Sequence, residues 1–388
     1  MASIKLKGDT SGEVTIQAPA VAGTTTLNLP ATSSTLATQN ALGVRNLIIN
    51  GDMRIDQRNA GASVSSNNSY AVDRLRNVFT SSGSFTAQQS TTAPDNFTNS
   101  VVWTVGSAAS ATSSQVANMQ YRLEGNTLYQ LGLGTSAAKT MTLSFWVRSS
   151  VTGTYCAAFI NSAADRAYVA EYTISSANTW EQKSITLTGD TSGTWLTTNG
   201  IGLRIQFDLG SGSDYNATAN TWVGANDFRT TNQTDFINNA GATFYITGIQ
   251  LEVGDTATPF EHRPFDQELL RCQRYFCKSF RYSDAVAEDA TSPAGGGLIA
   301  FTTTDARTVP LFFPTTMRTN ATITIWKGGL ASTSGRIAYY TSSWQTSSSA
   351  GVVDGIVMTN WWQAYATGSF TVGRAYIMQF TWTADAEL

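Results

Sequence analysis

The stretch from Thr243 to Tyr282 constrains the fold most, because its apolar residues change from one regular spacing to another. From Phe244 to Leu251 the run is rich in β-branched and aromatic residues, which predicts a strand. After two prolines, apolar residues recur at helical spacing and predict an amphipathic helix from Phe265 to Phe280. The stripe of this helix is Phe265, Leu269, Cys272, Phe276 and Phe280. The chain reads as strands on both sides, so we expect an all-β protein in which residues 265–289 connect two β domains.

Residues 46–264 are predicted to form the main β domain. Apolar and polar residues alternate clearly in Met141–Val147 and in Ile201–Leu209, as in half-buried strands. Eight or more short strands separated by Gly and Asn turns predict a two-sheet sandwich. Residues 290–388 repeat the pattern and predict a second β domain.

Residues 1–45 carry too few apolar side chains to bury much surface alone. Three short alternating runs predict strands, and isolated hairpins are marginal in water. We expect this segment to pair with copies of itself or to attach to another protein. A flexible leader is the alternative.

Composition excludes several classes of function. Charged residues make up only 13% of the chain, the net charge is −3, and no basic run occurs, so nucleic acid is not an expected partner. No run of about 20 apolar residues occurs, so no membrane insertion is expected. The three cysteines make no disulfide framework, and no export signal is visible, so we expect folding in a reducing cytosol.

The segment 210–241 is the first candidate binding site. It lacks periodicity, lies between two clear strands, and exceeds the ~12–15 residues beyond which loops are usually functional or disordered. Its aromatic residues lie among Asn, Asp and Thr, which suits stacking on sugars and bonding to hydroxyls. Packing of the loop onto the sandwich is the alternative. The candidates are Tyr215, Trp222 and Phe228 in this loop, and Trp361, Trp362 and Tyr365 in a second aromatic cluster that could equally be core.

Catalysis is not expected. Glycosidases use two carboxyl groups roughly 5–10 Å apart. The available pairs, such as Asp52 with Asp56 and Asp208 with Asp214, lie in turns where Asp commonly bonds its own backbone. We therefore expect no catalytic residues and no cofactor for chemistry.

Three stretches carry a resemblance to a known family. They are RNLIINGDMRIDQRNAG with YAVDRLR following, then ITGIQLEVGDTATPFEHRPFDQELLRCQRYF, and finally FTWTADAEL. Together they cover roughly residues 45–388. They resemble bacteriophage tail-fibre and receptor-binding virion proteins that contain a carbohydrate-binding-module-like jelly roll. The chain departs from the family at Leu75, where a tryptophan is usual.

The resemblance implies a fold, an assembly and a role. The sandwich would be a jelly roll whose first and last strands lie side by side, bringing Asn50 and Asp52 near Glu252 as candidate ligands of a structural Ca²⁺; ordinary turn hydrogen bonds are the alternative. The helix stripe would be the contact of a homotrimer. The protein would be assembled in the host cytoplasm into a virion, attached to other virion proteins through residues 1–45, and would adhere to host-surface glycan. A purely structural decoration or adaptor protein and a polysaccharide depolymerase remain as alternatives.

Overall fold

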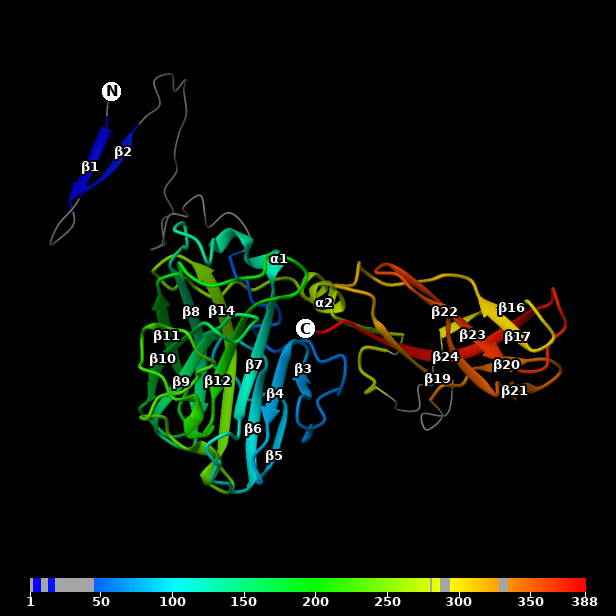
Figure 1. Cartoon of the computed structure of the whole chain (residues 1–388), viewed down its shortest axis with the longest axis horizontal. Helices are drawn as coiled ribbons and strands as arrows, with labels where there is room; N and C mark the ends of the chain where they lie inside the picture. Colours follow the sequence, from blue (N-terminus) through cyan, green and yellow to red (C-terminus); the bar gives the residue numbers. More distant parts are fainter. Residues whose placement is uncertain (1–2, 8–12, 18–44, 280, 287–293, 328–333) are drawn as a thin grey trace. The chain divides into compact units, whose positions relative to one another are not determined.

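The computed structural model describes residues 3–7, 13–17, 45–279, 281–286, 294–327 and 334–388 (Figure 1). The chain divides into two compact units, Met1–Gly43 and Val44–Leu388. In the first unit, β1 (Ser3–Lys7) and β2 (Glu13–Gln17) form an antiparallel hairpin in the places that the alternation predicts. The third predicted strand of this segment, around residues 27–29, lies outside the described residues.

The second unit begins with a jelly-roll sandwich of two antiparallel sheets (Figure 1). One sheet has the strand order β13-β10-β9-β12-β7-β4-β3, and the other has the order β11-β8-β14-β6-β5. The first sheet comprises β3 (Tyr70–Val72), β4 (Leu75–Phe79), β7 (Ala117–Glu124), β9 (Gly153–Ile160), β10 (Ala167–Ile174), β12 (Ile201–Asp208) and β13 (Trp222–Val223). The second comprises β5 (Ser84–Ser90), β6 (Ser100–Ser107), β8 (Met141–Ser149), β11 (Glu181–Leu187) and β14 (Thr243–Val253).

The core of the jelly roll lies between these two sheets and follows the predicted alternation. All four alternating residues of β8, Met141, Leu143, Phe145 and Val147, are fully buried. Burial of each such side chain contributes about 1.5–3 kcal/mol. The predicted two-sheet sandwich is therefore confirmed, although strands β3, β4 and β5 were not predicted.

The entry segment of the jelly roll lies beside its last strand, as expected. The Leu47 amide donates to the Leu251 carbonyl at 2.9 Å, and the Asn46 side chain both donates to Ile249 and accepts from Leu251. Residues 46–49 do not form the regular strand that the sequence predicts, because the Asn46 side chain makes part of the hydrogen bonds to the last strand. A Cβ on Gly51 would lie 2.1 Å from the Ile249 carbonyl oxygen, so this turn requires glycine.

The predicted helix is shorter than expected. Helix α2 (Phe265–Gln273) ends where Tyr275 and Phe276 become buried, and β15 (Phe276–Lys278) pairs with β24 (Ala375–Asp385). A spacing of four residues fits a helix, but pairing with β24 satisfies the backbone and buries the same aromatic side chains. Another short helix, α1 (Gly125–Leu128), follows β7. No helix in the described ranges is long and apolar enough to cross a membrane.

The shorter helix also breaks the predicted trimer stripe. Cys272 and Phe276 are buried within the same chain, whereas Phe265 is exposed. Leu269 is half-buried, and Phe280 lies outside the described residues. These five side chains therefore do not form one continuous exposed surface, which corrects the expectation that they do.

The second β domain is a ten-stranded sheet organised on two strands (Figure 1). Strand β24 pairs with β15, β16, β19 and β20, and β23 pairs with β17, β18 and β22. The remaining bounds are β16 (Ala294–Ala300), β17 (Asp305–Thr308), β18 (Leu311–Phe312), β19 (Thr322–Lys327), β20 (Ala338–Tyr340), β21 (Trp344–Thr346), β22 (Ser349–Val357) and β23 (Trp361–Thr367). Its core includes Trp362, Phe380 and Trp382.

An ionic cluster joins the jelly roll to the end of β24 and the residues that follow it. Arg58 pairs with Asp73 at 3.2 Å, with Asp385 at 3.2 Å and with Glu387 at 3.3 Å. Arg74, whose side chain is 4% exposed, also pairs with Glu387, which is 7% exposed. The Arg74 guanidinium lies 3.5 Å from the centre of the Tyr275 ring, so the segment after α2 takes part in the same cluster.

Candidate functional site

The loop 210–241 folds back onto the seven-stranded sheet. Trp222 lies in β13, which pairs with β10, and its indole nitrogen donates to the Thr188 carbonyl at 2.9 Å. Its ring packs on Tyr168 and Trp195, with centroids 5.3 and 5.5 Å away. Trp222 therefore packs the loop onto the sandwich, which is the alternative to ligand binding for this residue.

Tyr215 and Phe228 lie together at the other side of this loop. Their rings stack with centroids 4.3 Å apart, and the Tyr215 hydroxyl donates to the Ser114 carbonyl at 2.9 Å. Phe228 is buried over the outward face of β9 and β10, against Cys156, Ala158 and Val169. Tyr215 is only half-buried, so these two predicted residues form one wall of a groove.

This groove measures about 180 Å³ and lies on the outward face of the seven-stranded sheet. On β7 and β12 its polar lining residues alternate with core residues such as Tyr121 and Ile205. The strands β4, β7 and β12 supply its floor, and the loop supplies one wall. The lining residues are Asn68, Arg76, Val78, Val116, Asn118, Gln120, Arg122, Arg204, Gln206, Tyr215, Asn226 and Phe228.

Strand register arranges the polar side chains of the floor in rows. Gln120 on β7 lies between Arg76 on β4 and Gln206 on β12. In the next row, Arg122 lies opposite Arg204. Directly opposed side chains have Cβ atoms about 4.5–5.5 Å apart, so each row can contact one bound molecule.

Several hydrogen-bonding groups of this floor lack partners within the described residues. The Asn118 Oδ1 atom is buried and accepts no hydrogen bond, although its Nδ2 donates to Gln206 Oε1 at 3.4 Å. The oxygen of Gln120 accepts from Arg122 at 2.6 Å, which leaves its amide nitrogen to donate elsewhere. Buried polar groups without partners cost about 1–3 kcal/mol each, so a bound ligand that satisfies them gains free energy.

Charge in the groove is positive. Arg76, Arg122 and Arg204 line it, and none of its lining residues is Asp or Glu. Burial and the neighbouring Arg76 lower the pKa of Arg122 to about 10, and the same two causes lower the pKa of Arg204. Both pKa values are lowered in part because the positive charge of Arg76 repels the charges of Arg122 and Arg204.

The second predicted cluster is divided by strand alternation. Along β23, Trp362, Ala364 and Ala366 face the core, whereas Trp361 and Tyr365 face outward. Trp362 is fully buried against Phe380 and Trp382, which fits the core alternative. Tyr365 lines a pocket on this outward face.

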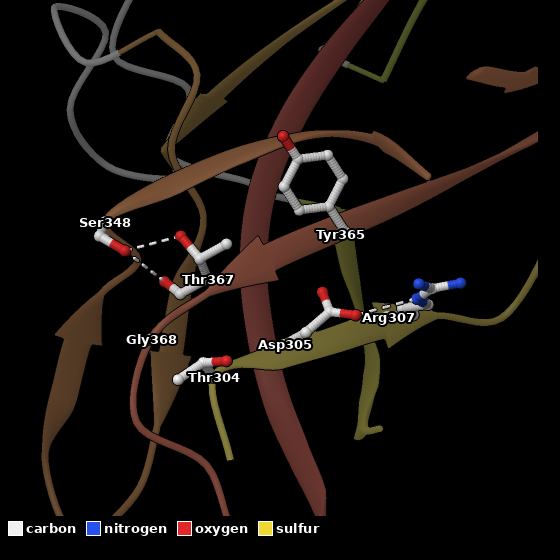
Figure 2. Close-up of a pocket in the computed structure, with 7 residues that line it drawn as sticks. All are labelled: Thr304, Asp305, Arg307, Ser348, Tyr365, Thr367 and Gly368. Atoms are coloured by element: carbon white, nitrogen blue, oxygen red, sulfur yellow. Dashed lines mark hydrogen bonds and ion pairs between the residues drawn. The ribbon is translucent and has the colours of Figure 1, made fainter. Parts of the chain in front are cut away.

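This pocket measures about 470 Å³ and is shown in Figure 2. Asp305 and Arg307 form an ion pair at 3.0 Å beside the Tyr365 ring. The Ser348 hydroxyl bonds to the Thr367 hydroxyl at 2.6 Å and to its carbonyl at 3.1 Å. The pocket therefore offers one aromatic face, but most of its polar groups already bond one another.

The three candidate calcium ligands are occupied by protein groups. The Asn50 side chain donates to the carbonyls of Ile55 and Asp73 at 2.8 and 2.9 Å. Asp52 pairs with Arg54, and Glu252 accepts from the Thr258 hydroxyl at 2.6 Å. Across the described ranges, no group of three or more His, Cys, Asp or Glu side chains is arranged to hold a metal. Hydrogen bonds and an ion pair within the protein account for the positions of these three side chains. A structural Ca²⁺ therefore stays a prediction.

Comparisons with protein families and with curated proteins found no match. Among solved structures, the enzymatically active domain of tailspike protein 4 of Bacteriophage CBA120 is 14% identical, with 54% of this chain and 21% of that chain covered and a TM-score of 0.28. A CBM4 structure is also 14% identical, covering 53% and 98%, with a TM-score of 0.27. The family 11 carbohydrate-binding module of Lic26A-Cel5E of Clostridium thermocellum is 11% identical, covering 51% and 99%, with a TM-score of 0.26. These identities and TM-scores are too low to assign a function to this chain. A function therefore has to be inferred from the residues of the groove.

Proposed function

We propose that the jelly roll binds host-surface glycan in the groove over β4, β7 and β12. The observation that carries this proposal is a group of amide side chains, one of them with a buried oxygen that accepts no hydrogen bond, beside a half-exposed aromatic ring. Asn118, Gln120 and Gln206 offer donors and acceptors at the spacing of neighbouring strands, and Tyr215 offers a ring at the edge. Sugar hydroxyls match the first set of groups, and sugar C–H faces match the ring.

We further propose that the chain is a non-catalytic fibre protein of a bacteriophage virion, as the sequence resemblance implies. It would be assembled in the host cytoplasm and attached to other virion proteins through residues 1–45. Several copies on one particle would convert weak single sites into avidity. A depolymerase would differ by releasing reducing ends from host polysaccharide, and a decoration or adaptor protein would bind no glycan.

We also propose that the chain forms a homotrimer. The contact surface would differ from the helix stripe that the sequence predicts. Large apolar side chains are exposed on the second β domain, including Phe301 at 57%, Phe312 at 69% and Ile377 at 64%. Large apolar side chains that are exposed in one copy can be buried against another molecule. We propose that two further copies cover it, together with the exposed Phe265 on α2. Mass photometry of the purified chain tests this, and a monomer at micromolar concentration would contradict it.

Binding of purified protein to a glycan array and to host cells tests the glycan site. Gln206→Ala removes one amide from the floor and should weaken binding about two- to tenfold, because a net hydrogen bond contributes about 0.5–1.5 kcal/mol. Gln88→Ala is the matched control, since Gln88 is an exposed amide on β5 in the opposite sheet. Equal binding by both variants would place the glycan elsewhere, and no binding by the wild type would favour the structural alternative.

A further inference from the structure

We propose that the groove is selective for acidic glycan, and that Arg76, Arg122 and Arg204 bind the carboxylate or phosphate groups of the sugar chain. This inference deepens the proposed function and rests on it. It concerns the class of ligand, which the amide groups alone do not define.

Strand register places the positive charges where the fold alone would not favour them. Arg122 lies directly opposite Arg204, and like charges in directly opposed positions destabilise a sheet. Arg76 lies one strand away from Arg122 and one row along, next to Gln120. Within the described residues, Arg76 makes no ion pair. The fold therefore holds three cations together in a groove whose lining residues include no Asp or Glu.

Two carboxylates close to the groove bond other protein groups. Asp208 shares a row with Asn118, but it is fully buried and accepts from the Gly210 and Ser211 amides at 3.1 and 3.2 Å. Glu387 raises the pKa of Arg122, but it pairs with Arg58 and Arg74. The positive charges of Arg76 and Arg204 are therefore left for a ligand.

The contacts that the arginines already make hold them in place. Arg122 donates to Gln120 and to the main-chain oxygen of Leu388, both at 2.6 Å. Arg204 donates to the Asn161 carbonyl at 2.8 Å. These contacts fix both guanidinium groups, and Arg204 is held by neutral carbonyl acceptors alone. Guanidinium binds carboxylate and phosphate through paired N–H donors, and such bonds are about twice as strong as neutral ones.

A bound anion would also relieve the mutual repulsion of the three arginines. Burial and neighbouring arginines lower the pKa of Arg122 and of Arg204, and a nearby anion acts in the opposite direction. A neutral sugar would leave this repulsion in place. The acidic ligand therefore gains a contribution that its neutral counterpart cannot obtain.

The test is binding of the full chain to an array that carries uronate-, sialate- and phosphate-bearing glycans, each beside its carboxyl-reduced or dephosphorylated counterpart. We expect acidic glycans to bind at least tenfold better than their neutral counterparts, and we expect this preference to shrink with added salt. Comparison of binding to the uronate and sialate spots with binding to the phosphate spots distinguishes carboxylate from phosphate as the group that is bound.

Arg76→Gln is the informative variant, because this side chain supports no ion pair in the described fold. It should weaken binding of acidic glycan about tenfold or more and leave binding of neutral glycan within twofold. Lys139→Gln is the matched control, since it removes one exposed charge from the same domain outside the groove. Its binding should equal that of the wild type.

The remaining outcomes separate the two proposals. Equal binding of acidic and neutral glycans by the wild type, with acidic binding weakened in Gln206→Ala but unchanged in Arg76→Gln, would overturn the acidic selectivity and keep the glycan site. Equal loss of acidic binding in Lys139→Gln and Arg76→Gln would show a general charge effect and also overturn the inference. Binding of no glycan of either kind would overturn both proposals.

Discussion

Replacement of Glu387 by glutamine tests how firmly the jelly roll is joined to the residues after β24. Glu387 accepts from Arg74, and it is the only carboxylate that Arg74 pairs with in the described part of the chain. Arg58, the other partner of Glu387, keeps Asp73 and Asp385. Glutamine preserves the shape of the side chain and removes its charge, so Arg74 stays buried without a counter-charge.

The expected loss is large for a substitution that keeps the size of the side chain. Removing one partner from a buried ion pair costs about 3–5 kcal/mol, because the other charge stays desolvated. Since the glutamine oxygen still accepts a hydrogen bond, we expect about 3 kcal/mol. A change of this size corresponds to a decrease of roughly 6–12 °C in Tm for a domain of ~150–250 residues.

Urea and thermal unfolding, followed by tryptophan fluorescence and near-UV circular dichroism, measure this loss. Asp235→Asn is the control, because Asp235 pairs with Arg229 at 3.4 Å and its side chain is 60% exposed. Exposed pairs contribute about 0–1 kcal/mol, so this variant should unfold almost as the wild type does. Equal shifts in the two variants would refute the reasoning that burial makes the Glu387 pair matter.

Single side chains elsewhere in the fold allow three more predictions. Gly51→Ala should destabilise the jelly roll by about 3 kcal/mol or more, because its Cβ would meet the Ile249 carbonyl oxygen at 2.1 Å, and a wild-type denaturation midpoint would contradict this. Burial raises the pKa of Asp208 to about 6, so the folded chain holds more protons than the unfolded chain between about pH 4 and 6, and this carboxyl's contribution to stability falls as pH rises through that window. The unfolding free energy of Asp208→Asn should therefore rise relative to the wild type by about 2 kcal/mol from pH 4.5 to 7, whereas parallel pH profiles would exclude the effect. The three free thiols, Cys156, Cys272 and Cys277, are buried with raised pKa values, so a thiol reagent should label them only after unfolding.

The sequence predicts the sandwich well where one face of a strand is apolar throughout. In β8 and β12 the alternation is unbroken, and the core residues lie where it predicts. Strand β3 was missed because it has only three residues. Strands β4 and β5 were missed because polar residues interrupt or outnumber their apolar ones. The helix was overestimated because Cys272 and Phe276 have a spacing that fits both a helix and a helix followed by a strand.

The candidate site was only partly predictable. Aromatic residues in an unusually long loop pointed to Tyr215 and Phe228, and both line the groove. The floor was missed, because its side chains lie on strands far apart in the sequence and only the register of β4, β7 and β12 brings them together. A signal was present nonetheless: the polar positions of β7 and β12 are Asn, Gln and Arg, which are longer than the Ser and Thr that commonly cover a solvent face.

The position of β24 in its sheet has a consequence for synthesis on the ribosome. Four strands of the second β domain pair with β24, which is the last of them to be translated. The strands of the jelly roll are all made earlier, so that domain can close while translation continues. Arg74 therefore has no counter-charge until Glu387 is made. In a nascent chain that stalls before Glu387, we expect the jelly roll to be folded with this cation unpaired, while the sheet that depends on β24 has not yet formed.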